Sequence, residues 1–168
     1  MLSKKMLDEL NVQIKHEFFS ANYYLAMAAY CIDRGLDGFG NFFIIQAEEE
    51  RFHAMKFFNY INSLNGRVTM TGYEEPRNDF KSLEEVFELA LKHEVFVTKR
   101  IHTLADLAQA EKHHPTISFL QWFVDEQVEE EATMSTWLDK VKLVGDNGHG
   151  LLMIDQELAA RTFTPPVA

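Results

Sequence analysis

Four glutamates recur near the centres of four long helical patterns, and a histidine accompanies one of them. The glutamates are Glu17, Glu50, Glu94 and Glu130, and His53 follows Glu50 by three residues. This E-x-x-H spacing puts both side chains about 60° apart on one helix face, so one metal ion can bind both. Because each buried, unpaired carboxylate costs several kcal/mol, four at one level indicate a cation site. Carboxylate oxygens with a single imidazole favour iron or manganese.

The helices that position these residues are marked by their ends. Ser3 can cap the first helix, Asp37 the second, and Ser82 with Glu85 forms a capping box for the third. Pro115 fits the first turn of the fourth. The predicted helices span residues 4–33, 38–65, 83–110 and 115–144, with a short fifth helix at about 149–161. Each glutamate then lies within about two residues of a helix midpoint, or ~3 Å along the axis.

Connection lengths predict how these helices are joined. Short turns make the first two helices antiparallel neighbours, and likewise the third and fourth. When fully extended, the linker at 67–81 would span ~50 Å, which is enough to pass along the whole length of a ~42 Å helix. We therefore expect an all-α, ferritin-like four-helix bundle with one long crossover between helices two and three. Residues 1–168 are expected to form a single domain, with the bundle at 1–144 and the fifth helix and tail at 145–168.

Composition narrows the functional classes. Of 168 residues, 46% are apolar and the formal net charge is −10, which disfavours nucleic acid and acidic membrane surfaces as partners. The single cysteine, Cys31, excludes an internal disulfide and fits a reducing cytosol. No apolar stretch approaches ~20 residues, and the start of the chain has no signal-peptide pattern. We expect a cytoplasmic protein.

Beyond the central residues, four longer segments have a sequence distinctive enough to be compared with known families. They are residues 46–54 (QAEEERFHA), 92–94 (KHE), 119–131 (FLQWFVDEQVEEE) and the terminal 161–166 (RTFTPP). Over essentially its whole length the chain resembles the prokaryotic non-haem ferritins. The resemblance implies one iron held by Glu17, Glu50 and His53 and a second held by Glu50, Glu94 and Glu130, with Gln127 beside the pair and Tyr24 hydrogen-bonded to a ligand.

The resemblance also implies an activity and an assembly. Ferritins of this kind form hollow cages of 24 subunits, oxidise Fe(II) with O2 or H2O2, and store the ferric mineral inside. A third iron site would lie on the cavity side at Glu49, Glu126 and Glu129. The alternative interpretation of these three residues is a solvated, charged helix face.

Two departures from related families refine this hypothesis. A symmetric di-iron site has a second E-x-x-H, whereas the corresponding stretch of the fourth helix, from Gln127 to Glu130, has no histidine. The second iron would therefore be held more weakly, by oxygen alone, which suits iron passed on to a store. Haem-binding bacterioferritins have a methionine where this chain has Arg51, so we expect no haem.

Other functions remain to be separated from ferroxidase activity. One is a di-iron peroxidase or oxygenase of the same bundle family, although a single cysteine excludes a rubredoxin domain. Another is a non-catalytic helical scaffold whose central acids form a buried network.

The fifth helix bears on assembly. Leu151, Ile154 and Leu158 recur at helical spacing, and a completed four-helix bundle has no interior place for them. We interpret this stripe as a contact between subunits of a homo-oligomer.

Overall fold

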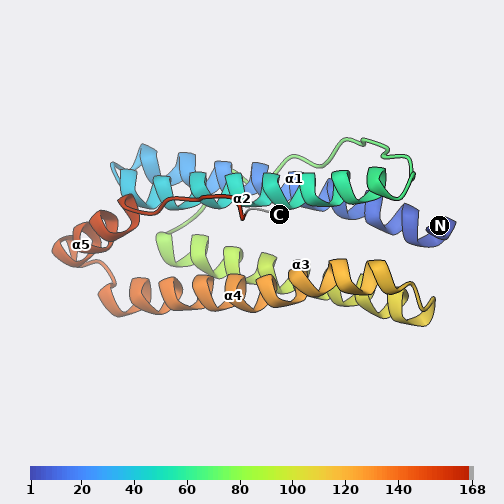
Figure 1. Cartoon of the computed structure of the whole chain (residues 1–168). Helices are drawn as coiled ribbons and strands as arrows, with labels where there is room; N and C mark the ends of the chain where they lie inside the picture. Colours follow the sequence, from blue (N-terminus) through green and yellow to red (C-terminus); the bar gives the residue numbers. More distant parts are fainter. Residues whose placement is uncertain (167–168) are drawn as a thin grey trace.

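The computed structural model describes residues 1–166, and all regular structure in that range is helical (Figure 1). The last two residues of the predicted tail, 167–168, lie outside the described residues. The helices are α1 Lys4–Asp33, α2 Asp37–Ser63, α3 Leu83–Ala110, α4 His114–Val144 and α5 Gly148–Ala159. The predicted all-α architecture is confirmed. None of these helices combines the length and the apolar character needed to cross a bilayer.

Two of the predicted caps form as expected. The Ser3 hydroxyl accepts the N–H of Met6 at 3.0 Å, and the Ser82 hydroxyl accepts the N–H of Glu85 at 3.1 Å. The Glu85 carboxylate accepts the N–H of Lys81 at 2.7 Å. The two hydroxyl bonds satisfy N–H groups that the first turn of a helix leaves without partners, and the Glu85 bond fixes the backbone just before α3.

The predicted boundaries differ from the observed ones by one or two residues. Asp37 does not cap α2 but is its first residue, where its carboxylate still interacts favourably with the helix dipole. α4 begins one residue before Pro115. α2 ends at Ser63, and α5 ends at Ala159.

The helices form two antiparallel pairs. α1 lies beside α2, and α3 lies beside α4 (Figure 1). The segment 64–82 crosses back along the bundle to start α3, and α1 also contacts α3. α5 sits at the end of the bundle where α1 turns into α2. This is the bundle with one long crossover that the connection lengths predicted.

The apolar core consists of two clusters separated by a polar layer. One cluster, with Phe43 and Phe87, lies toward α5, and the other, with Ile14 and Phe123, lies toward the opposite end. The central glutamates fall between them along each helix. The fold therefore interrupts its own hydrophobic core at the level of the acids.

The prediction that the apolar stripe of α5 needs another subunit is wrong. Ile154 and Leu158 are only 6% and 2% exposed, because they pack into the cluster at the near end of the same bundle. Leu143, Leu152 and Met153 are the exposed apolar side chains of this region, at 88%, 57% and 61%. The stripe completes the subunit's core, and the outward-facing side chains around it form a different surface.

Docking of α5 on α2 depends on a close backbone approach. The N–H of Phe39 donates to the Asp155 carboxylate at 3.0 Å, and the Asn41 amide donates to the carbonyl of Leu158 at 3.1 Å. A Cβ added at Gly38 would lie 1.7 Å from the carbonyl oxygen of Asp155. Only glycine allows this separation without moving one helix.

Gly38→Ala should therefore destabilise the protein by about 1–3 kcal/mol through overpacking. In an ordinary helix the same change stabilises by about 1 kcal/mol, so the sign itself is informative. The measurement is denaturant unfolding. Gly72→Ala is the matched control, since a Cβ there meets nothing within 4 Å. Equal stability of the two variants would contradict the close approach of α5.

Candidate metal centre

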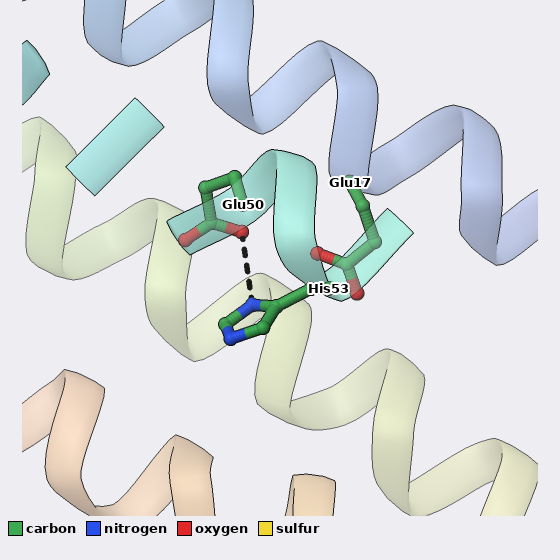
Figure 2. A group of neighbouring side chains, drawn as sticks. All are labelled: Glu17, Glu50 and His53. Atoms are coloured by element: carbon green, nitrogen blue, oxygen red, sulfur yellow. Dashed lines mark ion pairs between the residues drawn. The ribbon is translucent and has the colours of Figure 1, made fainter. Parts of the chain in front are cut away.

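The first group of candidate ligands joins α1 to α2. Glu17 projects from α1 and Glu50 and His53 from α2, and Figure 2 shows the three side chains turned toward one another. One ligand atom from each lies within 4.8 Å of the others. The Nδ1 atom of His53 is 3.5 Å from the Oε2 atom of Glu50. All three residues are buried, so a cation bound there would be shielded from solvent.

A second group lies directly beside the first. Ligand atoms of Glu50, Glu94 and Glu130 also fall within 4.8 Å of one another, and each residue is at most 4% exposed. Glu50 belongs to both groups. The structure thus brings together all five central residues, from four helices, with one carboxylate common to two adjacent sites.

Glu94 is held by both supporting residues that the sequence analysis named. The Tyr24 hydroxyl, fully buried, donates to Oε1 of Glu94. The amide of Gln127 donates to Oε2 of the same carboxylate at 3.1 Å. Burial and the nearby Glu94 carboxylate raise the pKa of Tyr24 well above its ordinary value, so this phenol stays a donor.

Two further supporting residues were missed by the sequence analysis. Gln13 donates to Oε1 of Glu17 at 2.9 Å. Gln46 donates to Oε1 of Glu50 at 3.1 Å and to Oε2 of Glu130 at 2.7 Å. Both glutamines precede a central glutamate by four residues, one helical turn away on the same face. This repeated Q-x-x-x-E pattern is the signal that could have identified them.

Once ionised, the central carboxylates have no matching Lys or Arg cation among the described residues. Within residues 1–166, no Lys or Arg nitrogen lies within 4.0 Å of a carboxylate oxygen of the four central glutamates. The buried Oε2 atom of Glu17 also has no hydrogen-bond partner among the described residues. Buried carboxylates are normally paired or bound to metal ions. The arrangement is therefore suited to binding divalent cations.

Burial and mutual repulsion keep protons on these groups in the metal-free protein. Burial, and next the neighbouring Glu50 carboxylate, raise the pKa of Glu17 and of Glu94 from 4.5 to about 8. Burial and a neighbouring carboxylate likewise raise the pKa values of Glu50 and Glu130. Since metal ligands must be deprotonated, a cation binding near neutral pH has to displace protons.

The three acidic residues predicted as a third iron site differ in their surroundings. Glu49 forms an ion pair with Arg161 at 2.7 Å. Glu126 lies with His53 and Glu130 in a third group whose ligand atoms are within 4.8 Å of one another. Glu129 is exposed and, like Glu49, does not join such a group among the described residues. A three-glutamate site here stays a prediction.

Comparison with known proteins agrees with the fold. The family model of the ferritin-like domain matches residues 7–144. The chain belongs to the ferritin family. It is 48% identical over 163 residues to a protein of Staphylococcus saprophyticus named bacterial non-heme ferritin, covering 97% of this chain and 98% of that one. A protein of the same name from Staphylococcus aureus is 46% identical over the same shares.

Solved ferritin structures superpose closely on this ferritin. An open pore ferritin from the hyperthermophilic archaeon Archaeoglobus fulgidus has a TM-score of 0.95 and 44% identity, over 96% of this chain and all of that one. An engineered closed form of the Archaeoglobus fulgidus ferritin has a TM-score of 0.96 and 45% identity, over 98% of this chain. The resemblance to prokaryotic non-haem ferritins is confirmed.

The raised carboxyl pKa values predict how the stability of this metal-free ferritin depends on pH. Between the unfolded value of 4.5 and the folded value of about 8, the native state binds more protons than the unfolded state. The free energy of unfolding should therefore fall as pH rises through this window, by about 1.4 kcal/mol per pH unit for each proton of difference. Denaturant unfolding of metal-free protein from pH 5 to 8.5 measures this slope.

Glu94→Gln should flatten the slope, because the amide fills the same space and carries no proton that titrates. Glu88→Gln, at an exposed ion pair with Lys142, is the matched control and should keep the wild-type slope. A stability that rises between pH 5 and 8 in wild type would show that these carboxylates do not dominate the pH dependence.

Proposed function

We propose that this ferritin oxidises Fe(II) to Fe(III) with O2 or H2O2 at a two-iron site inside each subunit. The ferric product would then be stored as mineral in a hollow homo-oligomeric cage. The observation that carries the proposal is the set of four buried carboxylates with no cation from the chain beside them, including a Glu17 oxygen without a partner. The names of the relatives, bacterial non-heme ferritins, support the same function.

The two bound iron ions would be the substrate, and the candidate ligands form one set for each ion. Glu17, Glu50 and His53 would hold the first, and Glu50, Glu94 and Glu130 the second, with Glu50 bridging. Hard carboxylate oxygens favour the ferric over the ferrous state, which assists oxidation. Because the second site has no imidazole, it would bind iron more weakly and release the product toward the store.

A third iron site at Glu49, Glu126 and Glu129 would bind ferric product on its way from this centre to the store. The grouping of Glu126 with His53 and Glu130 supports an extension of the acidic centre to Glu126 on α4. The ion pair between Glu49 and Arg161 would have to open before Glu49 could bind a cation.

Assembly and cofactor content follow from surface features and from the relatives. Exposed Leu143, Leu152 and Met153 would be covered by neighbouring subunits in a cage of 24, which we place in the cytoplasm. The cage is tested by loading the protein with iron under air, separating it by size exclusion and counting the iron in each fraction. Iron that elutes apart from a large assembly would contradict the cage.

We expect no haem, because Arg51 is exposed and a guanidinium does not ligate haem iron.

Two alternative functions remain to be separated by experiment. A non-catalytic scaffold is disfavoured because four buried acids held together are desolvated and repel one another, so they lower the stability of the metal-free protein. A di-iron peroxidase or oxygenase would use the same ligands but would turn over an organic substrate or peroxide without accumulating iron. Anaerobic Fe(II) titration followed by O2 distinguishes these cases, since only a storage protein retains many ferric ions per subunit.

Glu50→Ala and Glu94→Ala should each abolish fast Fe(II) oxidation, because each removes a ligand of the proposed pair. Both variants should stay folded, since loss of one buried acid reduces repulsion in the metal-free state. Stopped-flow absorbance after mixing with O2 gives the rate, and circular dichroism checks folding. Glu88→Ala, at the surface, should oxidise iron at the wild-type rate. Wild-type rates in either central variant would reject the two-iron assignment.

A further inference from the structure

The tail of the chain returns to the metal centre. Beyond α5, residues 160–166 run back along α2 (Figure 1). Arg161 donates from Nη1 to the carbonyl of Phe42 at 3.0 Å and from Nη2 to Oε1 of Gln46 at 2.8 Å and to Oε2 of Glu49 at 2.7 Å. Its guanidinium also lies over the Phe42 ring, 4.3 Å from the ring centre. The side chain is 20% exposed, so this contact is largely shielded from water.

Gln46 connects this arginine to two candidate iron ligands. It is fully buried, accepts from Arg161 through Oε1, and donates through Nε2 to Glu50 and Glu130. An arginine can only donate and an ionised carboxylate can only accept. The amide therefore has one orientation that satisfies all three neighbours, and the arginine and the carboxylates select the same one.

We propose that Arg161 is a positioning residue for the second iron site and acts on it through Gln46. This inference rests on the proposed two-iron function. Gln46 holds Oε1 of Glu50 next to Oε2 of Glu130, both members of the second group. The other oxygen of Glu50, Oε2, is the one that lies 3.5 Å from His53 in the first group. Loss of the arginine should consequently weaken the second site and leave the first unchanged.

The requirement is for an arginine and not for positive charge alone. Two nitrogens of one planar guanidinium reach a backbone carbonyl, an amide oxygen and a carboxylate on successive turns of α2. A lysine ammonium at this position would pair with the Glu49 carboxylate but lacks the fork that reaches Gln46 and the Phe42 carbonyl together. Arg161→Lys therefore separates charge neutralisation from positioning.

The test is anaerobic binding of Co(II) to the full-length, metal-free protein, followed by its visible absorption. Arg161→Ala and Arg161→Lys should each weaken the second Co(II) about 3- to 10-fold and leave the first at wild-type affinity. Gln46→Leu removes the direct contact to the ligands and should weaken the second Co(II) about 10- to 100-fold. The double variant Arg161→Ala/Gln46→Leu should match Gln46→Leu alone, because the arginine acts through the amide.

Lys140→Ala provides the matched control. It breaks the ion pair with Glu157 at 3.2 Å, which also joins this end of the chain to the bundle, but touches neither Gln46 nor a ligand. Its Co(II) binding should equal wild type. Weakening in Lys140→Ala, or equal weakening of both sites in Arg161→Ala, would mean general loosening and would overturn the positioning role.

The remaining outcomes are equally decisive. Wild-type binding in Arg161→Ala, full rescue by Arg161→Lys, or additive losses in the double variant would each overturn the inference. If the wild-type protein binds no pair of Co(II) ions, the two-iron function itself fails and the positioning role falls with it. If it binds two and only the variants behave unexpectedly, the two-iron function stands without this role for Arg161.

Discussion

The desolvation of four carboxylates is the constraint on which the rest of this structure depends. In an apolar interior the acids repel one another and favour their protonated forms, and the core has to be completed by separate clusters on either side of them. The hydrogen bonds that support them come from neutral groups: Gln13, Gln46, Gln127 and Tyr24. Neutral donors orient the oxygens without cancelling their charge. Lysines in the same places would have stabilised the empty centre and excluded a cation.

The helices and the common level of the glutamates could be predicted because their signals are local. Helix caps, short turns and a 3.6-residue period depend on neighbouring residues, so helix ends were placed within one or two residues. The packing of α5 could not be predicted in this way. Its burial depends on the chain folding back over the end of the bundle and on the close approach at Gly38. An apolar stripe shows that a surface is covered but does not say whether the same chain covers it.

The candidate site was likewise predictable only where its signals are local. The central ligands follow from residue type and helical level, and their supporting glutamines follow from a four-residue spacing that is easily overlooked beside the acids. The environment of Glu49 was not predictable, because its partner Arg161 comes 112 residues later. Adjacent acids along one helix look equivalent in sequence. In the fold, Glu50 lies in the buried centre and Glu49 meets the tail.

The differences between the two groups of ligands extend beyond the single imidazole. The first group includes His53 and a Glu17 oxygen without a partner among the described residues. In the second group both oxygens of Glu94 accept hydrogen bonds from neutral donors, Tyr24 and Gln127, whereas Glu17 accepts one bond, at a single oxygen. A bond from a neutral donor withdraws some electron density from the oxygen that would bind iron. Glu94 is thus held at both oxygens but is the weaker donor of the two carboxylates, a combination that would favour binding in a defined geometry together with ready release.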